Sequence, residues 1–419
     1  MNKYLSAGFL FFIFLAVYYA GSFTRIPFAD AIGFILPAEK GKFVTTATAT
    51  SHFLYTNTVI FVKNLAGINA IEASRFVIIT SAALTVSVIY ATVRVITKLE
   101  WASLAAAFIF GFSFSFWKNA EIVEVYTYNS LWLSLFFFSM VKSFKEKNKV
   151  YIPLSALFLG VSLWVHIQNI LLLPAFFLFL YYFRQEKKYA YLSFIIFALI
   201  FSAITILNIS QGLSLGSPYT SERGEWLSNS FKKTWLQYLQ DVVKSVVYVI
   251  YNFNVFFIAG IAGIFYLYTS DRKMFFVFFT ASLFVYGFAT FYAVTDNYVF
   301  FIPFNIIFAL SAGYGLSQLK YPWIKKFSWL CLGIPLFYLL SLKLVSVTRQ
   351  GQNFDQHKKY KGGLEYYMYP WMNNNIGILE FTIDGKTAPD PMIWMTVEAE
   401  KYIEFLKSKG FTEEQIRKL

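Results

Sequence analysis

The sequence predicts an all-α polytopic membrane protein of about 11 transmembrane helices, with amphipathic helices in its outer loops and a small C-terminal α/β appendage. Of its 419 residues, 57% are apolar, 21% are aromatic and only 14% are charged. A soluble globular chain is about 45–50% apolar and about a quarter charged, so this chain has too little polar surface to face water. The composition argues against a disordered chain, a disulfide scaffold or a nucleic-acid binder, and the single cysteine, Cys331, cannot form an internal disulfide.

Apolar stretches repeat along the first 345 residues. About 20 apolar residues are needed to cross a hydrocarbon core of ~30 Å as a helix. Eleven stretches meet or approach this length, the fifth and sixth being short: 4–22, 75–96, 101–117, 128–144, 151–164, 170–183, 189–209, 252–269, 274–294, 299–316 and 327–345. Residues 1–345 are therefore predicted to form one transmembrane domain.

Lysine and arginine are concentrated in alternate short loops. With the N-terminus inside, the basic segments are the N-terminal Lys3 and the loops at 94–98, 142–149, 184–188, 272–273 and 320–326. Short loops rich in Lys and Arg stay in the cytoplasm, so the net charge of +13 reflects topology rather than a polyanionic partner. This pattern predicts an integral protein of the plasma or inner membrane with a cytoplasmic N-terminus and no nucleic-acid partner.

Two outer loops are long enough to hold structure of their own. The first, 23–74, contains amphipathic pieces at 29–37 and 51–65, which we expect to lie along the membrane surface as helices. The second, 210–244, begins with loop-forming Gly, Ser and Pro residues. An amphipathic segment at 226–243 follows.

The composition changes after residue 345. The last segment is polar, and turn-forming residues stand at 362–363, 384–385 and 389–391. A final helix is expected at 397–409, with Gly410 ending it. We therefore predict that residues 346–419 form a small extracytoplasmic α/β domain.

Asp30 is the first candidate for chemistry, because an ionisable side chain near the membrane is costly and is usually retained for a function. It is the only acid before Glu39, and apolar residues surround it in the segment 26–33. Burial against such neighbours would raise the pKa of its carboxyl group, which suits a general base. The alternative is a loop carboxylate that caps a helix at 31–36, and the residue type alone favours the cap.

Glu121 and Glu124 stand at the outer end of the third stretch. Their i,i+3 spacing would place both on one helical face. Two adjacent carboxylates could bind a divalent cation, orient sugar hydroxyls or share one proton. The alternative is a pair of solvated loop acids whose charge is partly balanced by Lys118. The sequence does not decide between the two, so a bound divalent cation is one possible cofactor.

Polar residues also stand at two other outer boundaries. His166 is followed by Gln168 and Asn169 between the two short spans. This grouping fits either the polar lining of a cavity or a hairpin that satisfies its own backbone. Asp296 occupies a very short outer turn, where Asx residues are ordinary, and it is a weak candidate by itself.

An anionic, lipid-linked substrate would need a cation near the outer surface, ideally an arginine fork on a phosphate group. Five residues qualify by position: Arg75, Lys118, Arg223, Lys232 and Lys233. Arg75 and Arg223 are the preferred pair. The alternative for each is an interfacial side chain whose stem covers apolar surface.

The sequence lacks the signatures of soluble enzymes. It has no Walker A loop, no Rossmann glycine fingerprint, no Cys/His metal cluster and no G-x-S-x-G elbow, which disfavours an ATP-driven pump. No internal repeat of transporter type is evident, and the polar residues collect at the outer end. These features favour an enzyme over a secondary transporter.

An ordered set of motifs resembles a known family. Ser113-Phe-Ser-Phe-Trp117 is followed by Glu121 and by Glu124-Val-Tyr126, then by Gly160-Val-Ser-Leu-Trp-Val-His166, and later by the segment 292–303 that contains Asp296. Over roughly the first 320 residues, the set resembles the polytopic proteins related to protein O-mannosyltransferases, long catalogued as a domain of unknown function. These proteins belong to the GT-C class of glycosyltransferases.

The resemblance implies a GT-C-like fold and a hexosyltransferase, of mannosyltransferase-like type. GT-C enzymes take a sugar from a polyprenyl-phosphate donor and transfer it to a protein, lipid or glycan acceptor on the outer face of the membrane. In that class the acid in the first outer loop is the proposed base, and here that position is Asp30. The family's other motif residues map onto Trp117, Glu121, Glu124, Tyr126 and His166.

One motif departs from the family. Relatives carry a His-Pro-Pro-Gly stretch in the first outer loop, whereas the nearest match here is His52-Phe-Leu-Tyr55. The acceptor site is therefore reshaped, or activity is altered or lost, and His52 itself is expected to be a surface residue. Two other functions stay open: a transporter or flippase for a lipid-linked glycan, and a catalytically inactive assembly partner.

Overall fold

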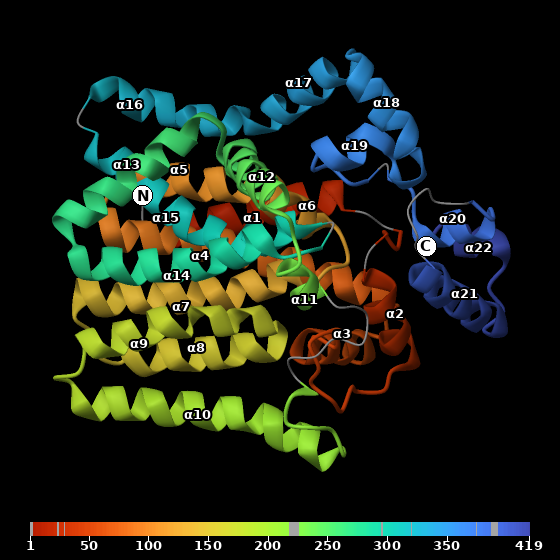
Figure 1. Cartoon of the computed structure of the whole chain (residues 1–419), viewed down its shortest axis with the longest axis horizontal. Helices are drawn as coiled ribbons and strands as arrows, with labels where there is room; N and C mark the ends of the chain where they lie inside the picture. Colours follow the sequence, from red (N-terminus) through yellow and green to blue (C-terminus); the bar gives the residue numbers. More distant parts are fainter. Residues whose placement is uncertain are drawn as a thin grey trace.

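The computed structural model describes residues 3–22, 25–28, 30–217, 226–294, 296–319, 321–373, 375–386 and 393–419. These residues form helices and connecting segments, and no β-strand occurs among them. The long helices lie side by side in one bundle, and shorter helices gather at one end of it (Figure 1). The predicted all-α polytopic membrane fold is confirmed.

The bundle is built from apolar helices of membrane-spanning length together with shorter ones. In the described part of the chain, six stretches are long and apolar enough to cross a membrane: Ala70–Thr97, Lys187–Ser210, Trp235–Ser270, Arg272–Phe291, Asn297–Gln318 and Pro322–Ser346. The shorter apolar helices are Leu5–Gly21, Glu100–Gly111, Tyr151–Val165 and Ile167–Tyr182. Helix α7 (Tyr126–Glu146) lies among them.

Burial differs sharply between the centre and the periphery of the bundle. The stretch Asn297–Gln318, which contains helix α15 (Ile302–Gln318), is almost fully enclosed by its neighbours. Helix α10 (Lys187–Ser210) and the stretch Pro322–Ser346 expose most of their apolar surface. A helix that is apolar all round belongs either in a core or in lipid, and both cases occur here.

Two predicted stretches differ from the observed helices. The third is divided at Phe112 and Ser113 into α5 (Glu100–Gly111) and α6 (Phe114–Glu121), because Ser113 takes an extended backbone. The eighth is longer than predicted, since α12 (Trp235–Phe253) runs through a short 3-10 turn into α13 (Phe257–Ser270).

The first outer loop folds as the amphipathic pattern predicts. After α1 (Lys3–Gly21) come α2 (Ala31–Lys40) and α3 (Phe53–Ala66), before α4 (Ala70–Thr97) returns into the bundle. Both short helices bury one apolar face, and their buried residues belong to a hydrophobic core separate from the core of the bundle.

The C-terminal segment is helical, so the predicted α/β character is wrong for the described residues. Its helices are α18 (Arg349–His357), α19 (Gly363–Met368), α20 (Ile378–Ile383), α21 (Ile393–Ser408) and α22 (Glu413–Arg417). Gly362, Gly363 and Gly385 have positive φ angles, which glycine adopts without strain. They separate short helices instead of turning β-hairpins.

This C-terminal segment packs directly on the first outer loop. The Ile378 backbone N–H donates to the Ile26 carbonyl oxygen at 2.8 Å, and Arg25 forms an ion pair with Glu380. Leu379, Phe381 and Tyr402 share one hydrophobic core with Ile26 and Phe28. Burying such side chains stabilises a fold by about 1.5–3 kcal/mol each, so the segment is held firmly over this end of the bundle.

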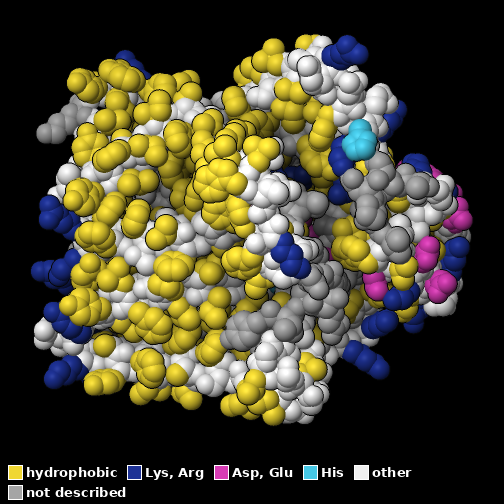
Figure 2. Space-filling model, in the orientation of Figure 1, with side chains coloured by type: hydrophobic (Ala, Val, Ile, Leu, Met, Phe, Trp, Pro, Cys, Tyr) yellow, Lys and Arg dark blue, Asp and Glu magenta, His cyan; other side chains and the backbone are white. Residues whose placement is uncertain are grey.

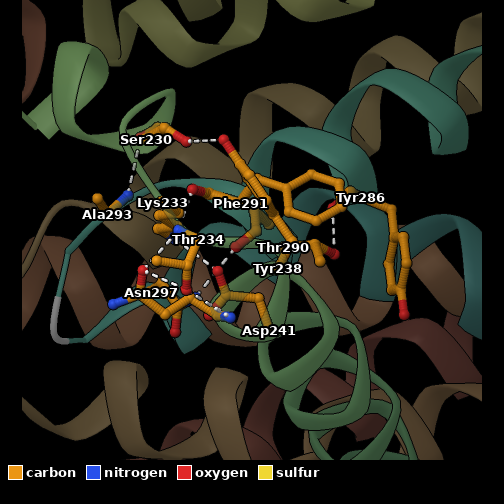
Figure 3. Close-up of polar contacts among 12 residues, drawn as sticks. Ser230, Lys233, Thr234, Tyr238, Asp241, Tyr286, Thr290, Phe291, Ala293 and Asn297 are labelled. Atoms are coloured by element: carbon orange, nitrogen blue, oxygen red, sulfur yellow. Dashed lines mark hydrogen bonds and ion pairs between the residues drawn. The ribbon is translucent and has the colours of Figure 1, made fainter.

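The second outer loop is fastened to the turn that follows α14 (Arg272–Phe291) (Figure 3). The Lys233 ammonium donates to Asp241 Oδ2 at 2.5 Å and to the Phe291 carbonyl oxygen at 2.8 Å. Ser230 Oγ accepts a hydrogen bond from the Ala293 N–H at 2.9 Å. These bonds fix the start of the turn that carries Asp296.

Candidate functional site

Three carboxylates from separate loops meet at the end of the bundle that carries the short helices. Asp30 precedes α2, Glu124 lies between α6 and α7, and Asp296 lies between α14 and α15. The backbone N–H groups of Asp30 and Val125 donate to the Glu124 carboxylate, and the charges of Asp30 and Asp296 both act on it. The structure therefore brings together three residues that are far apart in the sequence.

Asp30 stands at the N-cap position of α2 without acting as a cap. Its backbone is helical, with φ −73° and ψ −3°, and its side chain makes no capping hydrogen bond. A capping residue normally has an extended backbone and accepts a hydrogen bond from the second or third helical N–H. The helix-cap alternative is therefore wrong for this residue.

Burial governs the protonation of the other two acids. Burial raises the pKa of the Glu124 carboxyl group well above its ordinary value of 4.5, and the charges of Asp30 and Asp296 raise it further. The protein around Asp296 also raises the pKa of its carboxyl group, with Asp30 adding to the effect and Lys361 and Lys118 opposing it. Asp296 nevertheless remains exposed to solvent.

Two lysines face this cluster of acids. Lys118 is fully buried; its ammonium donates to the Tyr366 carbonyl oxygen at 2.6 Å and lies 3.6 Å from the centroid of the Tyr366 ring. Burial lowers the pKa of Lys118, the charge of Lys361 lowers it further, and Asp296 raises it. The ammonium of Lys361 lies 6.0 Å from the centroid of the Phe28 ring, beside the first outer loop.

Lys361 is the site residue that the sequence analysis missed. It belongs to a short 3-10 turn, Lys359–Lys361, in the C-terminal segment, more than two hundred residues from Lys118. No local pattern marks it, because only the packing of the C-terminal segment on the first outer loop brings it to the acids.

Tyrosine side chains wall the site. The Tyr126 hydroxyl lies within electrostatic range of all three acids, and its ring centroid is 5.9 Å from that of Phe300. The ring of Tyr298 lies 5.5 Å from the Lys118 ammonium. Aromatic rings of this kind can stack on the face of a sugar, and their hydroxyl groups can donate to its oxygens.

His166 borders the site and pairs with His52. The two ring centroids are 4.9 Å apart, and the His166 ring lies 5.8 Å from that of Tyr126. Burial lowers the pKa of His166, and the nearby His52 lowers it further, so His166 is neutral at neutral pH. His52 is buried, with Nδ1 3.0 Å from the Val165 carbonyl oxygen; its predicted surface position is wrong.

Glu121 does not share a helical face with Glu124. Helix α6 ends at Glu121 and the next residue is extended, so the i,i+3 pairing predicted from the sequence is wrong. The Glu121 carboxylate accepts hydrogen bonds from Trp117 Nε1 at 2.5 Å and from the Met372 backbone N–H at 2.9 Å. Glu121 therefore holds the C-terminal segment to α6, and Trp117 orients the Glu121 carboxylate.

Arg75, one of the preferred arginine pair, does not join the site. Arg75 donates to Ser22 Oγ at 2.9 Å and to Glu72 Oε1 at 2.6 Å, and it lies over the Tyr19 ring. These contacts tie α4 to the end of α1. Arg223 lies outside the described residues. Within the described ranges, no group of three acidic, His or Cys side chains is arranged as metal ligands.

Comparison with solved structures identifies the class of fold. ArnT from Cupriavidus metallidurans, a GT-C glycosyltransferase, matches over 83% of this chain in its apo state, with a TM-score of 0.55 and 14% sequence identity. ArnT bound to undecaprenyl phosphate matches over 81%, with a TM-score of 0.52 and 15% identity. This chain spans 66% and 64% of the length of those ArnT chains. The protein therefore has a GT-C-like fold.

A family model narrows the relationship. Residues 40–190 match the model described as the protein O-mannosyl-transferase TMEM260 N-terminal domain. The match contains Glu124 and His166, and it confirms over this segment the resemblance to proteins related to O-mannosyltransferases. A search of curated proteins gives no match.

Proposed function

We propose that the protein is a membrane glycosyltransferase that moves a sugar from a polyprenyl-phosphate donor to an acceptor hydroxyl on the outer face of the membrane. The observation that carries this proposal is the meeting of three acids and two lysines, from four separate segments, at one end of an apolar bundle. A GT-C-like fold and a relative in structure that is bound to undecaprenyl phosphate support a lipid-linked donor. The description of the matching family suggests mannosyl transfer.

The reaction needs few groups from the protein. The bond between the sugar's anomeric carbon and the phosphate oxygen breaks, and a bond from the acceptor oxygen to that carbon forms. The polyprenyl phosphate leaves with the bonding electron pair and needs no strong acid. The protein must therefore supply a base for the acceptor proton, cations for the phosphate charge, and exclusion of water.

Asp30 takes the acceptor proton in this proposal. Glu124 lies beside it and has a raised pKa, so Glu124 stays protonated at higher pH than an ordinary carboxyl group. A neutral Glu124 limits the repulsion that a second negative charge would exert on the acceptor oxygen. Tyr126, Asp296 and His166 border the space for the sugar.

Lys118 and Lys361 replace the arginine pair as the proposed phosphate ligands. The charge of Lys361 lowers the pKa of Lys118, and both lysines oppose the rise in the pKa of Asp296. Two lysine side chains therefore lie near one acid. Two buried or half-buried ammonium groups repel one another, so a phosphate anion between them would relieve that repulsion. An ammonium group binds phosphate as a point charge with several donors.

The distribution of charge supports the proposed orientation. Lys and Arg side chains line the end of the bundle opposite the short helices, and apolar side chains cover its flanks (Figure 2). Basic residues mark the cytoplasmic side, so the site and the C-terminal segment would lie outside the cell or in the periplasm. A donor carried by a membrane lipid would reach the site from the bilayer.

The test is a single substitution with a matched control. Asp30→Asn should leave membrane insertion and the melting temperature intact and abolish transfer from a panel of polyprenyl-phosphate sugars. Glu39→Gln, in the same outer loop, removes a carboxylate that instead accepts from the Ala70 N–H and should retain transfer. Full activity of Asp30→Asn would remove Asp30 as the base.

A further inference from the structure

Two of the chain's three histidines meet beside the site, and the proposed reaction gives neither of them a chemical step. The ring centroids of His52 and His166 lie 4.9 Å apart, and each residue is only 8% exposed. His52 directly precedes α3, and His166 stands between α8 (Tyr151–Val165) and the 3-10 helix η1 (Ile167–Leu172). Burying a polar ring is costly unless its nitrogen atoms have hydrogen-bond partners, so those partners define what the pair can do.

His52 stands in a backbone conformation that few residues with a side chain adopt. Its φ is 43° and its ψ is 53°, in the left-handed region where a Cβ atom is crowded. It occupies the N-cap position of α3, yet its side chain makes no capping hydrogen bond. Instead the ring reaches the end of α8, where Nδ1 lies 3.0 Å from the Val165 carbonyl oxygen. A strained backbone persists where the surrounding structure requires it, often at a functional site.

The hydrogen bonds of the two rings fix which nitrogen of each carries the proton. A carbonyl oxygen only accepts, so Nδ1 of His52 is the donor to Val165. Nδ1 of His166, by contrast, accepts from the Gln168 backbone N–H at 3.3 Å and thereby caps η1. Because His166 is neutral and an accepting nitrogen carries no proton, the proton of His166 is on Nε2.

The Nε2–H group of His166 is a donor without a partner. Nε2 is at the far end of the ring from Nδ1, so its N–H points away from η1. No residue in the described part of the chain accepts a hydrogen bond from it. Nε2 is also not among the unpaired polar atoms that are fully enclosed, so a ligand atom can reach it. The rings of Tyr126 and Phe300 flank the His166 ring, with their centroids 5.8 and 6.0 Å from its centroid.

We propose that His52 is a positioning residue, which holds the His166 ring so that Nε2–H donates one hydrogen bond to an oxygen of the transferred sugar. The sugar as the ligand rests on the proposed function, whereas the two proton positions do not. In this state His166 has no lone pair with which to take a proton from the acceptor. It therefore recognises the sugar, and the proton transfer is left to Asp30.

This arrangement predicts a specificity. A site built to hydrogen-bond one ligand oxygen discriminates against an analogue that lacks it, because the donor of the site is then left unpaired. The test is a set of polyprenyl-phosphate sugars in which one hydroxyl at a time is replaced by hydrogen. The wild type should transfer one of these deoxy sugars with about a tenfold lower kcat/KM. His166→Phe should no longer distinguish that deoxy sugar from its parent.

The proton positions are tested directly by nitrogen NMR of the full chain, labelled with ¹⁵N at histidine, in detergent. A protonated and an unprotonated ring nitrogen give well-separated signals. His52 should be protonated only at Nδ1 and His166 only at Nε2, and His357 of α18 supplies the signals of an exposed histidine in the same sample. A His166 ring protonated at Nδ1, or one that exchanges between both forms in the wild type, would overturn the inference.

His52→Asn tests the positioning role. Asparagine adopts the left-handed conformation readily, and its amide N–H can donate to the Val165 carbonyl oxygen in place of Nδ1. The variant should therefore keep its melting temperature and lose only the ring that faces His166. We expect the His166 signals to show both proton positions and kcat/KM to fall about tenfold. His357→Asn is the matched control and should change neither.

Two variants of His166 separate donation from proton transfer. His166→Gln retains an N–H near the place of Nε2 but cannot take a proton, whereas His166→Phe retains only the ring. The glutamine variant should therefore lose less transfer activity than the phenylalanine variant. Equal losses in both would overturn His166 as a donor.

The outcomes separate this inference from the proposed function. A His52→Asn protein with wild-type transfer and a single proton position on His166 would overturn the role of His52. Equal transfer of every deoxy sugar by the wild type would overturn the sugar contact. A wild type that transfers no sugar at all would overturn the proposed function, and with it the sugar as the ligand of His166. The fixed proton positions would in that case still be decided by the NMR spectra.

Discussion

Lys361→Met is the substitution that most directly tests how the site holds a phosphate. Lys361 is half-buried, and its charge lowers the pKa of both Lys118 and Asp296. A hydrogen bond to a charged group contributes about 1.5–3 kcal/mol, so removing this ammonium should weaken polyprenyl-phosphate binding about 10- to 150-fold. Methionine keeps the length and much of the apolar stem, so the contact with the Phe28 ring should survive.

The assay is the binding of undecaprenyl phosphate to the purified protein in detergent, followed by changes in tryptophan fluorescence. Lys359→Met is the matched control, because Lys359 is an exposed lysine of the same turn. Lys361→Arg should restore most of the affinity. The affinity of the wild type should fall with added salt more steeply than that of Lys361→Met, since the variant has lost one ionic contact.

An unchanged affinity in a folded Lys361→Met protein would refute the assignment of Lys361 to the phosphate. A loss of affinity accompanied by an equal loss of melting temperature would assign it a structural role instead. The comparison with Lys118→Met is informative as well. Lys118 donates to the Tyr366 carbonyl oxygen, so that variant should lose stability in addition to affinity.

Three further predictions follow from the described contacts. Because the pKa of Glu124 is raised in the folded protein, the protein loses stability as the pH rises from the ordinary carboxyl pKa of 4.5 toward the raised pKa. Glu124→Gln should therefore melt at a higher temperature than the wild type at neutral pH, and at the same temperature below about pH 4. This variant should also keep more transfer activity than Glu124→Ala. An equal melting temperature at neutral pH would contradict the raised pKa. Glu121→Ala leaves the Met372 N–H without its partner and should cost about 1–3 kcal/mol, seen as faster proteolysis of the C-terminal segment, with Glu121→Gln less affected; equal digestion would count against this tether. Lys233→Met breaks the link that fixes the turn before Asp296 and should lower the transfer rate several-fold, with Lys233→Arg restoring it; a wild-type rate in the methionine variant would show that the turn holds without it.

The bundle could be predicted from the sequence because its cause is local. Long apolar stretches must satisfy their backbone groups internally in lipid, and a helix does so without long-range partners. The same holds for α2 and α3, whose apolar faces repeat at helical spacing. The division at Ser113 was not predicted: there the Ser113 hydroxyl donates to the Phe110 carbonyl oxygen, and Asn252 of α12 accepts from the Ser115 N–H. The second of these contacts is long-range, and an apolar stretch does not report it.

The site was predictable only in part. Asp30, Glu124 and Asp296 each stand at the outer end of a predicted span, and topology brings such ends together. Lys361 could not be found this way, because it follows the last span and reaches the acids through packing of the C-terminal segment. Arg75 was a reasonable phosphate ligand by position, but the structure shows that it pairs with Glu72 on its own helix.

The predicted α/β character of the C-terminal segment was wrong because turn residues do not report the type of the flanking elements. Glycine pairs such as Gly362-Gly363 mark turns, and a turn does not state whether the flanking segments are strands or helices. His52 shows the opposite error: it follows the polar run 45–51 and was expected at the surface, whereas it is buried. Its partner, His166, lies more than a hundred residues away.

The order in which the chain is made gives the C-terminal segment another consequence. In the proposed orientation, Asp30 and Lys118 would reach the outer side early in synthesis, whereas Lys361 and Tyr366 would cross only after the final span has been inserted. A partly inserted nascent chain would therefore hold the proposed base and one lysine without Lys361. The proposed site would then become complete only when the last segment of the chain has folded onto it.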